Sequence, residues 1–428
     1  MAGVIQLETR GSQDVHLTDN PEYTYFATLF KRHTNFSMFE TELELKGEKD
    51  FDRLLTCHVH GDVGDLLKNI KIRISLNQIN QYNSGYAESI GHVLLEYVNM
   101  YIGDQLIQHI PSDYMQIYSE NFYTQTKQNI LSKTIGKANY ELSGTPVSDF
   151  TFLKFLNNSA LELIVDIPFY FHNNPELYFP ICALRFQELR FEVKIRNKNK
   201  CTWYDNFFTG TFSMGGVQQD DLIKDIKMIG EFICLDKPEL EHFKTSELTY
   251  LINYVQTNIF KVPSTNDTFT AKLDFMNMIK ELFIIIQGNS TNYSVFDYDN
   301  SNQFYQGYIN YEHLKYLTLE LDGETILDEL TGDVINLRAI QSDIHHTRTQ
   351  LFRRYYIYSF ALRPESWKPT GHRNFSPIKE QIMKLYLNPE TDDRLLKIYA
   401  LTTNILNINK GETTLLYNYG RTDSVKLN

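Results

Sequence analysis

Alternation of apolar and polar residues dominates this chain. In residues 70–76, IKIRISL, every second side chain is apolar, and residues 189–195 and 317–321 repeat the pattern. Successive side chains of an extended chain point to opposite faces, so each run predicts a strand with one face on a core and the other in a polar setting. Polar breaks that contain Gly or Pro separate the runs, which is typical of antiparallel sandwiches and barrels. The pattern predicts an all-β protein.

Helical patterns are few and short. Ser112 is placed to cap a short helix with aromatic and aliphatic residues on one face. Asp236, with Pro238 inside the first turn, is placed to start a second helix that runs through Phe243. Neither segment is long enough to organise a domain.

The length of 428 residues predicts at least two domains, because single cores stop growing near about 250–300 residues. Residues 100–107 and residues 319–326 share a pattern of extended run, Gly turn and apolar residues, and residues 180–193 are echoed by residues 377–387. These echoes favour two domains of one architecture; the alternative is coincidence between strand–turn units, which recur in any β protein. We predict an N-terminal arm over residues 1–25, a first domain over 26–237 and a second over 238–428.

Composition and charge narrow the class of protein. Aromatic residues make up 14% of the chain, with 28 Tyr and 28 Phe, which favours strands. The net charge is −12 and the chain has no basic stripe, so we expect no direct contact with nucleic acid. No apolar run reaches the roughly 18 residues that a membrane span needs. Four dispersed cysteines without a CxxC pair predict a reduced, intracellular protein.

Three side-chain groupings invite a chemical interpretation. His58 and His60 share one face of a predicted strand and would need a third ligand to hold zinc, so we favour a solvent-facing or structural pair. The DYD triplet at residues 297–299 lies in a polar loop, residues 288–307, that we expect on the outer surface as a hydrated loop and not a calcium site. The acidic residues near Asp220 and Asp225 do not predict the facing carboxylates of a glycosidase. We therefore predict no enzyme, no cofactor and no metal.

Residues 351–376, LFRRYYIYSFALRPESWKPTGHRNFS, are the most specific segment. A β-rich run at 355–362 leads into a turn with Pro and Gly at 364–371, and the turn leads into a second extended run that starts at 374–376. The segment predicts a long corner between two strands. We interpret His345 and His346, just before it, as a turn at the start of a strand.

The motifs of the whole chain, in their order, resemble the major capsid proteins of nucleocytoplasmic large DNA viruses. They include GSQDV at 11–15, RHTNF at 32–36, IPFYF at 167–171, HTR at 346–348 and the corner itself. The residues that carry the resemblance, and that it implies are structural, are Asp14, Asn20, Pro21, Arg32, His33, Thr34, Asn35, Phe36, Pro168, Pro180, Tyr250, Gln256, His346, Thr347, Tyr358, Ser359, Phe360, Gly371, Asn374, Phe375 and Ser376. For residues 32–36 we favour the start of a strand with a hydrogen-bonded turn over a charged contact site.

The resemblance implies two tandem eight-stranded jelly rolls with a few short helices in loops. It also implies a homotrimer that forms a roughly hexagonal block in an icosahedral virion shell assembled in the host cytoplasm. The implied partners are further copies of the chain, neighbouring capsomers, minor capsid or cement proteins and an internal viral membrane. Residues 1–21 have few apolar residues and no strong alternation, so we expect them to form an arm that reaches under a neighbouring capsomer. The alternatives are a scaffold or minor capsid paralogue of the same fold and a carbohydrate-binding or carbohydrate-cleaving β-sandwich protein.

Overall fold

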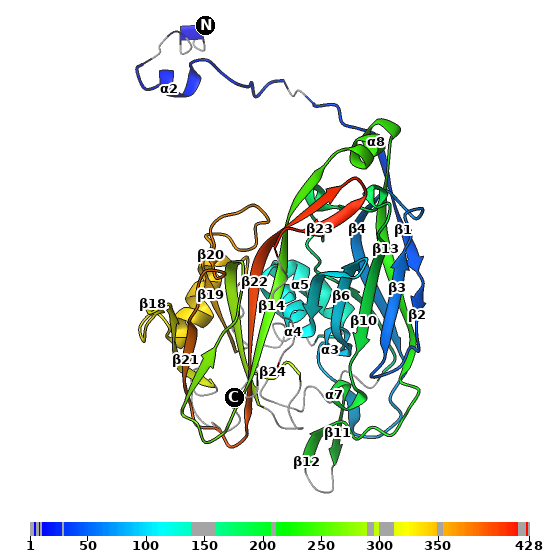
Figure 1. Ribbon diagram of the computed structural model, residues 1–428, viewed down its shortest axis with the longest axis vertical. Helices are drawn as coiled ribbons and strands as arrows, with labels where there is room; N and C mark the ends of the chain where they lie inside the picture. Colours follow the sequence, from blue (N-terminus) through cyan, green and yellow to red (C-terminus); the bar gives the residue numbers. More distant parts are fainter. Residues whose placement is uncertain are drawn as a thin grey trace. The chain divides into compact units, whose positions relative to one another are not determined.

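The structure is a computed structural model that describes residues 4–5, 8, 11–27, 30–137, 159–206, 211–288, 295–298, 312–348, 354–417 and 425–426. It separates into two compact units, Met1–Phe36 and Ser37–Asn428. In the first unit, all described residues are exposed, and α2 (Val15–Thr18) is a single helical turn. The second unit contains all the sheets described below (Figure 1).

The first half of the second unit is built from two main sheets. The first sheet has the order β1 (Phe36–Leu43), β13 (Ile223–Leu235), β4 (Leu66–Leu76), β8 (Leu161–Asp166), with β9 (Phe179–Pro180) also paired to β4. The second sheet has the order β2 (Leu45–Lys46), β3 (Leu54–Val59), β10 (Leu189–Ile195), β6 (Leu95–Ile102), β7 (Gln105–Pro111). A small third sheet has the order β12 (Thr211–Met214), β11 (Thr202–Asn206), β5 (Ser84–Tyr86).

The second half repeats this arrangement. Its first sheet has the order β19 (Tyr355–Ser359), β16 (Met278–Gly288), β22 (Arg394–Asn409), β14 (Leu248–Val262), β24 (Val425–Lys426), with β20 (Arg373–Asn374) on β16 and β23 (Glu412–Leu415) on β22. Its second sheet has the order β15 (Thr268–Lys272), β21 (Gln381–Leu387), β17 (Leu314–Leu321), β18 (Glu324–Leu327).

The two halves have one topology. The main strands in chain order are β1, β3, β4, β6, β7, β8, β10 and β13 in the first half, and β14, β15, β16, β17, β18, β19, β21 and β22 in the second. Numbered one to eight, both sets give a sheet of order 1-8-3-6 and a sheet of order 2-7-4-5, which is the jelly roll. The two tandem jelly rolls predicted from the sequence are therefore confirmed.

The predicted internal repeat is also confirmed. The Gly turn at Gly103 joins β6 to β7, and the one at Gly323 joins β17 to β18, so both lie in the hairpin between the fourth and fifth main strands. Both glycines have positive φ, +57° and +81°, a conformation in which glycine carries no steric penalty. The second echo pairs β10 with β21, the seventh main strand of each roll.

Alternation places the strands as predicted. In β4, Ile70, Ile72 and Ile74 are fully buried, whereas Arg73 between them is exposed. Residues 189–195 form β10, and residues 317–321 lie in β17. Among the described residues no helix is long and apolar enough to cross a membrane.

The two predicted helices are present. α8 (Lys237–Thr245) starts as expected, because Asp236 Oδ1 accepts a hydrogen bond from the Lys237 amide at 2.8 Å. α4 (Ser112–Asn121) differs at its start: Ser112 is its first residue and not its cap, and its hydroxyl instead accepts a hydrogen bond from Arg196 at 2.5 Å. Further helices are α3 (Ile90–Leu94), α5 (Gln125–Ile135), α7 (Lys198–Cys201), η2 (Pro175–Leu177), η3 (Ile181–Ala183), and η4 (Asn336–Ile340) continuing into α9 (Gln341–His345).

One sheet of the second roll is buried on both faces. In β16, Leu282 and Ile284 belong to the core of the second roll, whereas Phe283 and Ile285 belong to the core cluster of the first roll. In Figure 1, α4 and α5 lie between the strands of the two rolls. The joint between the rolls is therefore a packed apolar contact.

The loop at residues 288–307 differs from its predicted position. Of its residues, 289–294 and 299–307 lie outside the described part. Val295, Phe296 and Tyr298 are buried and pack in the first core cluster, so the expected place on the outer surface is wrong for them. The loop was predicted to be exposed because most of its residues are polar, but these three side chains pack against the core. Of the DYD triplet at residues 297–299, which we predicted to be hydrated and not a calcium site, Tyr298 is buried and Asp299 lies outside the described residues.

Candidate functional site

The predicted corner is confirmed and is attached to a single strand. β19 pairs with Glu281 to Ile285 of β16, and β20 pairs with Met278 and Ile279 of the same strand. The corner between them is closed by a hydrogen bond from the Leu362 amide to the Thr370 carbonyl at 3.1 Å. Gly371 has a φ of +127°, and a Cβ there would lie 3.0 Å from the Phe360 carbonyl oxygen, so the corner requires glycine. The predicted second extended run is short: β20 ends at Asn374.

A buried ionic cluster holds the corner to β16. His346 is fully buried and lies between two carboxylates, with Nε2 2.8 Å from Glu281 Oε1 and Nδ1 3.0 Å from Glu365 Oε1. Glu365 also accepts hydrogen bonds from the Thr347 amide at 2.8 Å and the Thr347 hydroxyl at 2.5 Å. Next to Glu281, the Lys280 Nζ donates to the Ser366 carbonyl at 2.7 Å. The interpretation of His346 as a turn at the start of a strand is wrong, because it follows the last residue of α9 and its side chain enters the protein.

The charges of this cluster follow from its geometry. Burial alone would lower the pKa of His346, but the Glu281 and Glu365 carboxylates raise it to about 9. Burial opposes ionisation of Glu365, yet hydrogen bonds from His346 and Thr347 hold its pKa below the usual range. Burial lowers the pKa of Lys280 to about 8, and Glu281 acts in the opposite direction. At neutral pH His346 is therefore a buried cation between two acids.

A second buried cluster joins the two rolls. Asp113 of α4 accepts hydrogen bonds from Tyr298 at 2.9 Å, from Lys397 at 2.9 Å and from Tyr399 at 2.8 Å, all from the second half of the chain. Burial would raise the pKa of Asp113, but Lys397 and Tyr399 outweigh it and hold the pKa below its usual value. Tyr114 of the same helix packs edge-on against Phe283 of β16. Sequence reasoning missed this cluster, whose members are up to 286 residues apart.

The signature residues of the second half lie close together. Phe375 is fully buried and packs edge-on against Phe360, which packs in the same way against Tyr358. Ser359 Oγ accepts the Ala361 amide at 3.2 Å, and Asn374 Oδ1 accepts the Ser376 amide at 3.0 Å. These six signature residues, Tyr358, Ser359, Phe360, Asn374, Phe375 and Ser376, line the two ends of the corner.

Two signature residues lie in β14, and two lie in the first roll. Gln256 is buried and exchanges hydrogen bonds with the backbone of Met276, at 2.6 and 3.1 Å. Tyr250 is half-buried against the first core cluster. Pro168 is buried just after β8, and Pro180 is the last residue of β9 and pairs with Leu66.

The signature residues of the N-terminal unit are exposed. Asp14 precedes α2, and its Oδ2 accepts the Gly11 amide at 2.8 Å. Asn20 has a positive φ of 49° and is followed by Pro21. Residues 32–35 lead into β1, which starts at Phe36, so they do precede a strand. The expected hydrogen-bonded turn is not found in described residues 31–35; the His33 ring instead contacts the Thr34 carbonyl at 2.7 Å.

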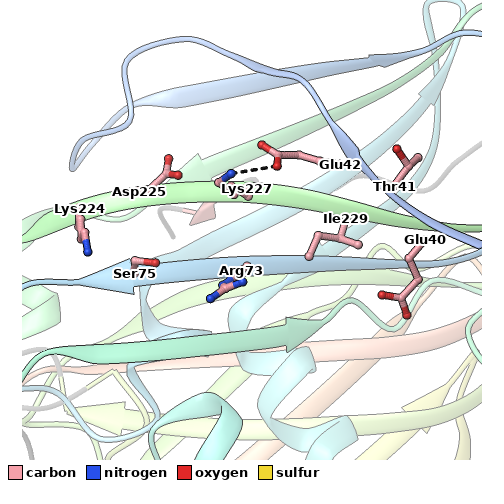
Figure 2. Close-up of a pocket in the computed structure, with 9 residues that line it drawn as sticks. All are labelled: Glu40, Thr41, Glu42, Arg73, Ser75, Lys224, Asp225, Lys227 and Ile229. Carbon is pink, nitrogen blue, oxygen red and sulfur yellow. Dashed lines mark hydrogen bonds and ion pairs between the residues drawn. The ribbon is translucent and has the colours of Figure 1, made fainter.

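An open hollow lies on the outer face of the first roll, on the sheet β1-β13-β4-β8 (Figure 2). Nine residues line it: Glu40, Thr41, Glu42, Arg73, Ser75, Lys224, Asp225, Lys227 and Ile229. Most of its charges are paired within this sheet or with a neighbouring loop: Lys227 with Glu42 at 2.9 Å, and Asp225 with Lys49 at 2.7 Å. A hollow of paired charges around an isoleucine suits contact with another protein surface better than it suits catalysis.

The other groups considered from the sequence show no catalytic geometry. His58 and His60 share the Glu188 carboxylate, at 3.0 and 3.7 Å. Within the described ranges, no group of three or more His, Cys, Asp or Glu could hold a metal ion. Asp220 pairs with Lys198 at 3.0 Å, so it and Asp225 are engaged with separate lysines. All four cysteines are free.

Comparison with known proteins identifies the class. A model of the N-terminal part of major capsid proteins matches residues 24–236, and a model of the large eukaryotic DNA virus major capsid protein matches residues 239–414. The major capsid protein of Pyramimonas orientalis virus is 26% identical over 424 residues, 97% of this chain and 99% of that one. That of Paramecium bursaria Chlorella virus 1 is 24% identical over 464 residues, with the same coverage of 97% and 99%.

Solved structures agree on the fold. PBCV-1 VP54 matches with a TM-score of 0.75 at 21% identity, over 92% of this chain and all of that one. The Faustovirus major capsid protein matches with a TM-score of 0.71 at 10% identity, over 94% and 95%. The fold thus defines a double jelly-roll protein. The chain belongs to the major capsid proteins of large eukaryotic DNA viruses, a family of structural proteins and not of enzymes.

Proposed function

We propose that this chain forms homotrimeric capsomers of roughly hexagonal outline, which tile an icosahedral virion shell. The observation that carries the proposal is the repeat of one strand order in two rolls packed side by side in a single chain. Three copies would supply 3 × 2 = 6 similar rolls around a threefold axis, and a closed ring of identical subunits stops growing at a defined size. The signature residues at the corner and in β14 would act structurally, by fixing loops between strands.

We infer that the other partners are neighbouring capsomers, minor capsid or cement proteins and an internal viral membrane, and that the shell assembles in the host cytoplasm. The excess of acidic over basic residues, 53 against 41, supports a shell that makes no direct contact with the genome. The abundance of the chain in purified virions tests the role directly. We expect it to be the dominant shell protein by quantitative mass spectrometry; a trace amount would instead indicate a scaffold or minor capsid paralogue.

We further propose three segments: an arm at residues 1–25, a first roll at 26–237 and a second roll at 238–428. Support comes from the separate compact unit Met1–Phe36 and from family matches that meet between residues 236 and 239. The exposed apolar side chains Leu17, Tyr23 and Tyr25 give the arm a surface to bury against a neighbouring capsomer.

Deletion of residues 1–19 tests the arm. Because no core residue is removed, the shortened chain should still form trimers of unchanged thermal stability, while assembly of shells in a co-expression system should fall. Loss of the trimer itself would show that the arm belongs to the capsomer and not to its contacts with neighbours.

A further inference from the structure

The chain contains one complete joint between two rolls. In the first roll, the connection between the fifth and sixth main strands, β7 and β8, contains α4. This helix packs on the outer face of the second roll's sheet β14-β22-β16-β19, where Tyr114 meets Phe283 and Asp113 meets Lys397. The joint thus consists of a helix from one roll and the outer sheet face of the next.

The second roll carries a helix in the same connection, between β18 and β19, but its outer side is uncovered. Residues 334–345 form this helix, and Ile335, Ile340 and Ile344 are 54%, 46% and 63% exposed. A π turn of five residues separates the first two and an α turn of four separates the last two, so they share one face. Leu362 of the corner, also exposed, lies beside them, since its carbonyl contacts His345 at 3.2 Å. We call these four side chains the isoleucine face.

The first roll, in turn, leaves its corresponding sheet face uncovered. The outer side of β1-β13-β4-β8 is the equivalent of the sheet face that α4 covers in the second roll, and it holds the hollow of Figure 2. Ile164 of β8 is exposed there, and Ile229 lines the hollow. Within the described residues, the second roll thus has an exposed helix side and the first roll an exposed sheet face, and these are the two kinds of surface that the joint within the chain brings together.

We propose that the isoleucine face of one copy docks on the hollow-bearing sheet face of the next copy. The contact repeats between chains the joint already made within the chain. This proposal rests on the proposed trimer. It specifies the two surfaces that meet between copies, and it states that these surfaces are different from each other. A head-to-tail contact of this kind closes into a ring when the rotation permits, so the third copy returns to the first.

The two surfaces are compatible in chemistry. Four aliphatic side chains on one side would bury Ile164 and Ile229 on the other, and desolvated aliphatic contacts stabilise an interface in proportion to the apolar area removed from water. At the edge, Asp343 beside Ile344 is exposed, and Lys224 at the hollow carries the opposite charge and is also exposed. The ion pairs in the hollow would keep their own partners in the contact, and polar groups are common at the rim of protein interfaces.

A charge-insertion experiment tests the isoleucine face. In the full-length chain, Ile340→Glu with Ile344→Glu should convert the trimer to a monomer with an unchanged circular dichroism spectrum. The matched control is Ile130→Glu, which alters an isoleucine that is 66% exposed on α5, and it should stay trimeric. If the wild type and the double variant are both trimers, the docking proposal is overturned and the proposed function stands. A wild-type monomer overturns both.

A cross-linking experiment tests that the two surfaces are different. In a background with Cys182→Ser and Cys234→Ser, chains with both Ser75→Cys and Ile344→Cys should yield covalent oligomers up to the trimer with a short bis-maleimide. Chains with either cysteine alone should stay monomeric on a denaturing gel. Dimers from Ile344→Cys alone would mean that isoleucine faces meet each other. If the double variant is trimeric in solution but yields no covalent oligomer, residues 75 and 344 of neighbouring copies do not lie close together. Either result overturns the proposal.

Discussion

At the residue scale, the most informative group is the buried cation between Glu281 and Glu365. Removing one member of a buried ion pair leaves an uncompensated charge, so His346→Gln should lower the free energy of unfolding by about 3–5 kcal/mol. His372→Gln is the matched control: it changes an exposed histidine of the same corner and should alter stability by less than about 0.5 kcal/mol. Urea or thermal unfolding measures both, and an effect of equal size in the two variants would contradict this role for His346.

The same histidine makes stability depend on pH. Its pKa rises from 6.5 to about 9 on folding. The contribution of His346 to the free energy of unfolding is therefore fully present below about pH 6.5 and is lost as the pH rises through about 9. Lys280 has the opposite sign, because its pKa falls to about 8 and its burial penalty disappears at higher pH. Between pH 6.5 and 8 the wild type should therefore lose up to about 1.4 kcal/mol per pH unit relative to His346→Gln. Parallel pH profiles for the two proteins would refute the assignment.

Sequence reasoning did not predict this group, although a signal was present. Lys280 and Glu281 interrupt the otherwise apolar run of residues 278–286, and charges in a buried strand need partners. Their partners come from the helix end and the corner, which are 65 or more residues away in the chain, so only the tertiary structure identifies them.

At the element scale, alternation predicted β4, β10 and β17 because each has one polar face. It does not predict β16, because this strand is buried on both faces and has no alternation of apolar and polar residues. It also missed α5, whose sequence QTKQNILSKTI has few apolar residues. The loop at 288–307 failed for a related reason: overall polarity concealed the three apolar side chains that pack in the first core cluster.

The joint between the rolls gives a prediction at this scale. Asp113→Asn keeps the shape of the side chain but removes the charge that faces Lys397, so the free energy of unfolding should fall by about 1.5–3 kcal/mol, the contribution of a hydrogen bond to a charged group. Asp104→Asn, at the exposed turn after Gly103, is the control and should be close to neutral. Chemical denaturation of the two variants would measure the difference, and an Asp113→Asn protein as stable as the control would show that the apolar contacts alone hold the joint.

At the scale of the whole molecule, two rolls of one strand order are joined by a helix on a sheet face. In the described part of the chain, the equivalent helix of the second roll and the equivalent sheet face of the first roll both have exposed sides. The all-β class followed from alternation and the two similar domains from the internal repeat, because both reflect local rules of strands and turns. The jelly-roll topology was implied by the family resemblance. The joint did not, because it depends on which faces meet after both rolls have folded.

The central claim is that one chain supplies two of the six rolls of a closed threefold block. The mass of the purified wild-type chain under native conditions, by light scattering or native mass spectrometry, tests it most directly. The account predicts a stable species of three times 50.2 kDa that persists on dilution. A well-behaved monomer at 50.2 kDa would contradict it.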